Sequence, residues 1–164
     1  AATRTMGVAL SSCIPPAKGT PLFEIAEDEM EIGVGIHGEP GRRRAKIGTA
    51  DEIVDELLHA IVPDLPFTSG DEVALMVNGL GGTPISELYI LYGTAHSRLD
   101  GQGITVGRSY VGEYCTALDM AGASITLVKL DDEIKELLLQ TAIYCGVPDA
   151  NTAFRIASRV LDEE

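Results

Sequence analysis

The stretch that decides the fold reads Met30-Glu31-Ile32-Gly33-Val34-Gly35-Ile36-His37-Gly38-Glu39-Pro40-Gly41. It starts as a strand-like run and then places four glycines and a proline around one histidine. Glycine lets the backbone turn sharply and approach a ligand closely, and Pro40 cannot donate a hydrogen bond to a sheet. We therefore predict a strand that ends in a rigid loop and presents His37 beside a small concavity. An imidazole there can act as a base, an acid, a metal ligand or a nucleophile.

Strand-like runs recur on both sides of this stretch. They are Thr5–Leu10, Leu22–Ala26, Glu29–Ile36, Glu72–Val77, Ile104–Val111 and Ala123–Lys129. The short polar turn Glu27-Asp28 predicts that the second and third runs form a hairpin.

Helical patterns lie between and after these runs. Thr49-Ala50-Asp51-Glu52 is typical of a capping box, and it precedes apolar residues at helical spacing: Ile53, Val54, Leu57, Leu58 and Ile61. A second helix is predicted from Pro84 to about Leu99, with a buried face made of Ile85, Leu88, Leu91 and Tyr92. Asp131 can cap a third helix, which Gly146-Val147-Pro148 separates from a last helix ending near Leu161.

These elements predict an α+β fold. The expected architecture is a two-layer domain whose mixed sheet of about six strands carries helices on one face, followed by a C-terminal helical hairpin. With 164 residues, of which 45% are hydrophobic, the chain can bury one good core.

Charge and composition limit the classes of partner that the chain can bind. The formal net charge of -13 argues against nucleic acid and against anionic membranes, since both are polyanions. No signal-peptide pattern and no apolar run of membrane-spanning length is present. Three cysteines without paired spacing fit reduced thiols in the cytoplasm, and none has metal-ligand spacing to a histidine. We expect a cytoplasmic protein without a metal site.

The stretch around His37 resembles the signature of the substrate-binding K subunit of dihydroxyacetone (glycerone) kinases. Three further blocks resemble that family in the same order: Arg4-Thr5-Met6-Gly7-Val8-Ala9-Leu10-Ser11-Ser12-Cys13, then Val77-Asn78-Gly79-Leu80-Gly81-Gly82-Thr83-Pro84, then Gly112-Glu113-Tyr114-Cys115-Thr116-Ala117-Leu118-Asp119-Met120-Ala121-Gly122. Together they cover residues 1–137, which are similar to the second domain of that subunit. Cys115 has no adjacent base in the sequence, and we interpret it as structural.

The resemblance implies a chemistry for His37. In that family the matching histidine binds the ketone of dihydroxyacetone covalently, as a hemiaminal, for phosphoryl transfer from a partner subunit or domain. The bond positions the substrate and discriminates against glycerol, which has no carbonyl group. Gly35, Gly38 and Glu39 are the expected neighbours in the substrate pocket.

The resemblance also implies what the chain does not carry. The K subunit of the family is about twice this long, and its first half supplies the acid/base residues, so we expect the isolated chain to be an inactive kinase component. That subunit holds no nucleotide, so ATP or ADP-Mg is expected only on a partner, and no cofactor here. The tail, residues 138–162, resembles the C-terminal helices of the γ-carboxymuconolactone decarboxylase family. We therefore predict that residues 138–164 are a helical tail of different origin.

Two further clusters have alternative interpretations. Gly81 and Gly82 lie in a loop between a strand and a helix N-terminus, which favours anions, but the glycine spacing matches no phosphate-binding motif, and we favour a tight turn that needs positive φ. Arg42, Arg43 and Arg44 either are a solvated run or meet a phosphate donor or acidic partner.

The function hypothesis follows from these patterns. We expect the substrate-binding part of a dihydroxyacetone kinase, a homodimer that binds a short-chain ketone and a phosphodonor. The alternative is a non-catalytic carbonyl-binding, scaffold or regulatory module with the same fold.

Overall fold

The computed structural model describes residues 2–37 and 39–144. The chain divides into two compact units, Ala1–Lys129 and Leu130–Glu164.

The first unit is built on one six-stranded sheet. Its strands are β1 (Thr3–Ala9), β2 (Glu29–Ile32), β3 (Arg43–Lys46), β4 (Glu72–Gly79), β5 (Thr105–Gly112) and β6 (Gly122–Lys129). They lie in the order β3-β2-β1-β6-β4-β5. Only β4 and β5 run parallel, and the other neighbours are antiparallel. The predicted mixed sheet of about six strands is confirmed.

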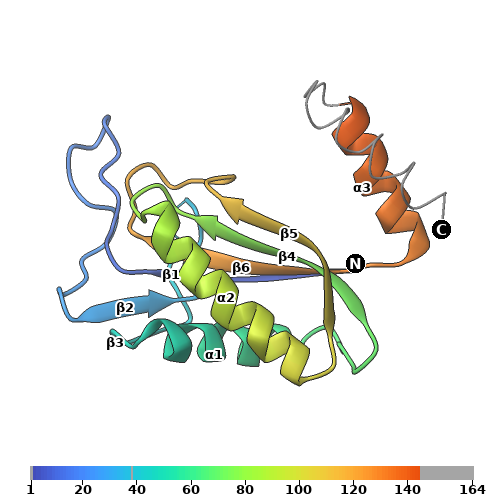
Figure 1. Cartoon of the computed structure of the whole chain (residues 1–164). Helices are drawn as coiled ribbons and strands as arrows, with labels where there is room; N and C mark the ends of the chain where they lie inside the picture. The colour runs from blue at the N-terminus through green and yellow to red at the C-terminus, as the bar shows by residue number, and fades with distance from the viewer. Residues whose placement is uncertain (1, 38, 145–164) are drawn as a thin grey trace. The chain divides into compact units, whose positions relative to one another are not determined.

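Two helices cover one face of this sheet. Figure 1 shows α1 (Ala50–Ile61) and α2 (Ile85–Gly101) lying across it, and the two helices contact each other. The predicted capping box is confirmed, because the Thr49 side chain accepts from the Glu52 N–H while the Glu52 carboxylate accepts from the Thr49 N–H. All five predicted apolar residues of α1 are buried.

The predicted buried face of α2 is wrong at one residue, Ile85. Ile85 is 52% exposed, whereas Leu88 and Leu91 are buried. The reason is that Pro84 forms the N-cap instead of the first helical residue. Ile85 then falls one turn before the contact with the sheet.

The strand prediction on either side of residue 27 is also wrong. Leu22–Ala26 is not a strand: Leu22 and Phe23 pack in a loop, and the Phe23 N–H donates to Ser12 Oγ at 3.1 Å. The partner of β2 is β3, which pairs Glu31 with Arg44 and Ile32 with Arg43. β2 ends at Ile32 rather than Ile36. The hairpin therefore encloses the glycine-rich loop instead of preceding it.

A smaller apolar cluster lies on the other face of the sheet. Val8 belongs to the main core beneath the helices, and successive residues of a strand point to opposite faces. Ala9 accordingly packs in a second cluster, which also contains Cys13, Val34, Leu80, Ala117 and Met120. This cluster joins the loops at one end of the sheet, including the loop that carries His37.

The described part of the second unit is one helix, α3 (Asp132–Tyr144). The predicted cap is confirmed, because the Ile134 N–H donates to Asp131 Oδ1 at 2.8 Å. The predicted break at residues 146–148 and the last helix of the hairpin lie outside the described residues. Within residues 2–37 and 39–144, no helix has the length and apolar character needed to cross a bilayer.

Candidate functional site

The loop from Gly33 to Gly41 is closed at its base by backbone hydrogen bonds. The Arg42 N–H donates to the Ile32 carbonyl at 2.7 Å, and the Gly33 N–H donates to the Gly7 carbonyl at 2.7 Å. Gly33 has φ +82°, and a Cβ there would lie 2.8 Å from Arg42 Cγ. A glycine is therefore required where the chain leaves β2.

A buried carboxylate anchors the far end of the loop. Glu31 is only 8% exposed. Its Oε1 accepts from the Gly41 N–H at 2.9 Å, and its Oε2 accepts from Arg44 Nε at 2.8 Å. Because a buried carboxylate is costly without partners, these two bonds fix where the loop returns to β3. This role of Glu31 cannot be predicted from the residue pattern, because it depends on the pairing of β2 with β3.

His37 lies at the tip of the loop and faces solvent. Its side chain is 79% exposed, and its Nδ1 lies 3.0 Å from Glu39 Oε1. The His37 N–H also donates to Glu39 Oε2 at 3.0 Å. A fully extended segment would keep the two side chains apart, but a turn at residues 36–37 brings them together. Glu39 thus holds both the backbone and the ring of His37.

Gly35 makes room for this arrangement. A Cβ on Gly35 would lie 2.1 Å from Glu39 Oε2, so any other residue would displace the carboxylate. The Gly35 N–H donates to the Glu39 carbonyl at 3.3 Å. Of the predicted pocket residues, Gly35 and Glu39 therefore lie beside His37, whereas Gly38 lies outside the described residues.

The carboxylate of Glu39 is ionised at neutral pH. Hydrogen bonds from backbone N–H groups, its own first and that of His37 next, hold the pKa of Glu39 below its usual range. An ionised acceptor beside Nδ1 favours the ring tautomer that carries its proton on Nδ1. The Nε2 lone pair is then left free to attack an electrophile.

The three arginines after the loop have separate roles. Arg43 forms an ion pair with Glu56 at 2.8 Å, and Arg44 forms one with Glu31. The Arg42 guanidinium is exposed and has no ion pair within the described residues. Arg43 and Arg44 are therefore not simply solvated. The Arg43 ion pair links β3 to α1, and the Arg44 ion pair links β3 to the carboxylate that anchors the His37 loop.

Gly81 and Gly82 form a tight turn packed against a neighbouring loop. Gly81 has φ +112°, and a Cβ there would lie 1.8 Å from the Leu118 carbonyl oxygen. The Gly82 N–H donates to the Met120 carbonyl at 2.9 Å, so it is not available to an anion. The positive φ accounts for Gly81, whereas Gly82 is needed for space, because a Cβ there would lie 2.6 Å from the Asp119 carbonyl oxygen.

Asn78 ties these loops to the sheet. It is 2% exposed, and its Oδ1 accepts from the N–H groups of Tyr114 and Cys115, each at 2.8 Å. Its Nδ2 donates to the Cys115 carbonyl at 3.0 Å. The exposed thiol of Cys115 belongs to a residue whose backbone is held in this way, which agrees with a structural role for that cysteine. Among the described residues, no three His, Cys, Asp or Glu side chains gather in a way that could hold a metal ion.

Comparisons with known proteins agree with the pattern of motifs. The Dak1 domain model matches residues 1–144. The dihydroxyacetone-binding subunit DhaK of PTS-dependent dihydroxyacetone kinase 2 from Listeria innocua is 47% identical over 136 residues, which are 83% of this chain and 41% of that protein. The DhaK subunit of the PEP-dependent dihydroxyacetone kinase of Escherichia coli is 41% identical over 153 residues, covering 79% of this chain and 43% of that protein. The chain thus spans less than half the length of these relatives.

Solved structures share the fold. The dihydroxyacetone kinase operon co-activator Dha-DhaQ matches with a TM-score of 0.77 at 34% identity, over 84% of this chain and 43% of that chain. The dihydroxyacetone kinase of C. freundii, solved with AMP-PNP and Mg2+, matches with a TM-score of 0.68 at 33% identity, over 84% of this chain and 25% of that chain.

The comparisons correct one expectation about the tail. They give no support to the resemblance of residues 138–162 to the γ-carboxymuconolactone decarboxylase family. The Dak1 match instead continues to residue 144, the last residue of α3. The match to the Dak1 model covers most of the sequence, including every strand of the sheet and the loop that carries His37, and the chain belongs to the Dak1 domain family.

Proposed function

We propose that this chain is the ketone-binding part of a dihydroxyacetone kinase and that it holds its substrate covalently on His37. The observation that carries the proposal is the pair formed by His37 Nδ1 and Glu39 Oε1, 3.0 Å apart on an exposed, anchored loop. Membership of the Dak1 family and the printed function of the DhaK relatives support the substrate class.

The covalent step is the addition of a neutral imidazole to a ketone. The Nε2 lone pair attacks the carbonyl carbon, and the π electrons of the C=O bond move to the oxygen, which takes a proton from water. The ring gains a positive charge in this step, and the Nδ1 proton passes, directly or through the Glu39 carboxylate, to the hydroxide left by that water, so the water is regenerated. The product is a hemiaminal that contains the whole ketone. No water is lost, and no oxidant or reductant is needed.

Such a bond would orient the substrate for phosphoryl transfer. A fixed carbon skeleton presents one hydroxyl group in a single direction, which removes much of the entropic cost of bringing two reactants together. Glycerol cannot form the adduct, because it has no carbonyl carbon. His37 would therefore act in both positioning and specificity.

The phosphoryl group would come from elsewhere. The His37 loop contains no nucleotide-binding motif, and in the Gly81–Gly82 turn the Gly82 N–H already donates to the Met120 carbonyl. The relatives are named as PTS-dependent and PEP-dependent kinases, which favours a separate donor subunit. Because the chain spans about 41% of the Listeria subunit, we expect the acid/base groups to lie in the remaining part of such a subunit.

A second function has support from one comparison. The co-activator Dha-DhaQ shares the fold with a TM-score of 0.77, and its name describes a regulator of an operon. A regulator needs to sense the ketone but not to turn it over. The alternative is therefore a carbonyl-binding regulatory module.

Native mass spectrometry tests the adduct. Dihydroxyacetone should add the mass of the intact ketone to the chain, and His37→Ala should abolish the addition. His96→Ala is the matched control, because His96 is an exposed histidine on α2. An adduct that persists in His37→Ala and disappears in His96→Ala would refute the role of His37.

Turnover separates the two functions. The chain alone should not phosphorylate dihydroxyacetone, since loss of a general base usually costs about a hundred- to ten-thousand-fold. Adding the N-terminal portion of a DhaK subunit and a phosphodonor subunit should restore turnover in an enzyme component. An adduct without any turnover in that mixture would favour the regulatory module.

A further inference from the structure

A hollow lies on the helix-covered side of the sheet, at the base of the His37 loop. Its volume is about 600 Å³, and its lining comes from β1, the end of β2, the start of β3 with the residue before it, and α1 with the residues after it. The charged residues around it are Arg4, Arg42, Arg43, Glu56 and Asp64. His37 is not among the lining residues. The hollow therefore does not include the side chain proposed to bind the ketone.

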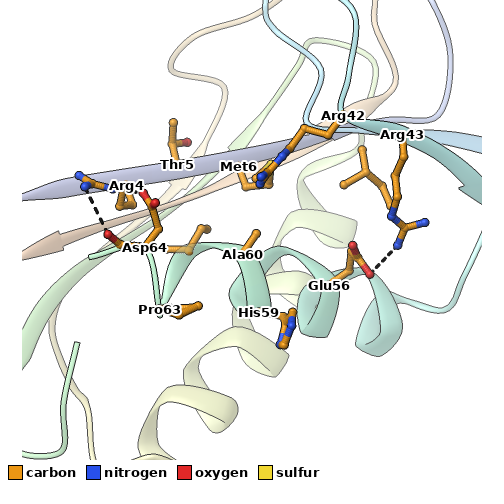
Figure 2. Close-up of a pocket in the computed structure, with 12 residues that line it drawn as sticks. Arg4, Thr5, Met6, Arg42, Arg43, Glu56, His59, Ala60, Pro63 and Asp64 are labelled. Atoms are coloured by element: carbon orange, nitrogen blue, oxygen red, sulfur yellow. Dashed lines mark hydrogen bonds and ion pairs between the residues drawn. The ribbon is translucent and has the colours of Figure 1, made fainter. Parts of the chain in front are cut away.

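Two ion pairs close the ends of this hollow. Arg43 pairs with Glu56 on α1, and Arg4 pairs with Asp64 just after α1. Figure 2 shows these two pairs as dashed lines on either side, with the Arg42 side chain lying between them. The two carboxylates are therefore occupied by the outer arginines.

Arg42 is the cation without a partner. Its guanidinium makes no ion pair with any described residue, and Figure 2 shows it reaching toward Met6 in the middle of the hollow. Its side-chain stem passes 2.8 Å from where a Cβ of Gly33 would lie, so the glycine at that position with φ +82° leaves the space for it. The glycine thus gives the stem of Arg42 room to lie against the loop.

The charge of the hollow is opposite to that of the chain. Three arginines face two carboxylates here, an excess of one positive charge, in a chain whose formal net charge is -13. A guanidinium presents a planar fork of donors that matches the oxygens of a phosphate or carboxylate. A doubly charged anion can also draw on Arg4 and Arg43, whose side chains are 33% and 51% exposed.

Most of the remaining wall is apolar. It is formed by Met6, Ile32, Ala60, Ile61 and Pro63, together with the polar residues Thr5 and His59. Small-molecule sites commonly have volumes of about 300–1,000 Å³ and combine apolar walls with a few polar groups. A bare inorganic anion would leave these walls in water, whereas a short carbon skeleton would cover them.

We propose that this hollow binds a small phosphate monoester, with Arg42 as its main ligand and the apolar wall against its carbon skeleton. The proposal does not depend on His37 or on the kinase function. It applies equally to an enzyme component and to a regulator.

A titration followed by amide NMR shifts tests the site. The probes are inorganic phosphate, glycerol 3-phosphate and acetate, each added at constant ionic strength with chloride as the balancing anion. We expect saturable shifts in residues 42–43 and 59–64, with glycerol 3-phosphate binding several-fold more tightly than inorganic phosphate. Equal binding of acetate would refute the phosphate assignment, and shifts centred on residues 33–37 would place the anion at the other site.

Variants identify the ligand. Arg42→Ala should weaken glycerol 3-phosphate binding by roughly tenfold or more, because a charge-assisted pair is lost. The affinity of Arg42→Lys for glycerol 3-phosphate should lie between those of wild type and Arg42→Ala, since an ammonium keeps the charge but lacks the planar fork of donors. Arg98→Ala is the matched control, because Arg98 on α2 pairs with Asp55 and does not line the hollow.

A further variant changes the local charge in the other direction. Glu56→Gln should tighten binding by about fivefold, because it releases Arg43 and removes a negative charge from the rim. Equal affinities of wild type and Arg42→Ala for glycerol 3-phosphate would overturn the proposal.

Discussion

Replacing Glu31 by glutamine tests how the His37 loop is anchored. The Glu31→Gln substitution keeps the shape of the side chain but removes its charge. The amide oxygen can still accept one hydrogen bond from the Gly41 N–H or from Arg44, and the amide NH2 group then turns toward the other donor. The substitution therefore breaks the anchor and leaves the packing around it intact.

The magnitude follows from the two contacts. A hydrogen bond to an ionised group contributes about 1.5–3 kcal/mol, and a neutral one about 1 kcal/mol. The Glu31 side chain is 11% exposed, so its lost bond is not replaced fully by water, whereas Arg44 is 47% exposed and can rehydrate. We expect the free energy of unfolding to fall by about 2 kcal/mol, which is a decrease of roughly 1 M in the urea midpoint for ordinary urea dependence.

Urea unfolding and amide exchange measure the two consequences. The midpoint of Glu31→Gln should fall, and the amide protons of residues 33–37 and 39–42 should exchange faster than in wild type. Glu27→Gln is the matched control, because Glu27 is an exposed glutamate that makes no described side-chain contact. If Glu31→Gln and Glu27→Gln share one midpoint and one exchange pattern, Glu31 does not anchor the loop.

Two further predictions concern the turn and the acidic groups. Gly81→Ala should prevent folding or cost at least about 3 kcal/mol, since its Cβ would strike the Leu118 carbonyl oxygen at a backbone angle that alanine avoids. Gly93→Ala, in open space on α2, should instead stabilise by up to about 1 kcal/mol; equal urea midpoints for the two variants would contradict this. A hydrogen bond from Lys129 holds the pKa of Asp71 below its usual range, so this carboxylate stabilises the fold above about pH 4 and loses that effect as the pH falls through the lowered value. The difference in thermal midpoint between wild type and Asp71→Asn should therefore shrink below about pH 4, and a difference that grows on acidification would refute the assignment.

Local patterns predicted the elements that bury a regular apolar face. The α1 residues repeat at helical spacing behind a capping box, and every one of them is buried. The central strands likewise follow from their apolar runs. In these elements, local preference and burial against the sheet favour the same structure.

The β3 edge of the sheet could not be predicted in the same way. β3 reads Arg43-Arg44-Ala45-Lys46, which has no apolar alternation, because neither of its faces is buried and three of its four residues are exposed. Leu22 and Phe23 do carry a strand-like pattern, but they lie in a loop, where their partly buried side chains pack against the second cluster. The apolar residues of this segment therefore indicated correctly that it packs against the domain, but they indicated the wrong secondary structure.

The site was predictable in part for a similar reason. His37 and its glycines stand out because the sequence is unusual there. The contact with Glu39 depends on a turn at residues 36–37, which a residue pattern does not define. The anchor at Glu31 depends on the pairing of β2 with β3, whereas the residue pattern predicts Leu22–Ala26 as the partner of β2.

The central strand pair determines the order in which the domain can fold. β1 aligns along its whole length with β6, so Thr3 meets Val128 and Ala9 meets Gly122. Contacts between residues this distant along the chain require a long loop to close, and the entropic cost of closure comes before the contacts contribute any favourable free energy. Folding rates therefore fall as such contacts dominate. During synthesis, β1 has no partner for its β6 edge until almost the whole first unit has been made. The domain therefore depends on late, slow closure of its sheet, and the time before closure is when β1 is most open to pairing with another chain.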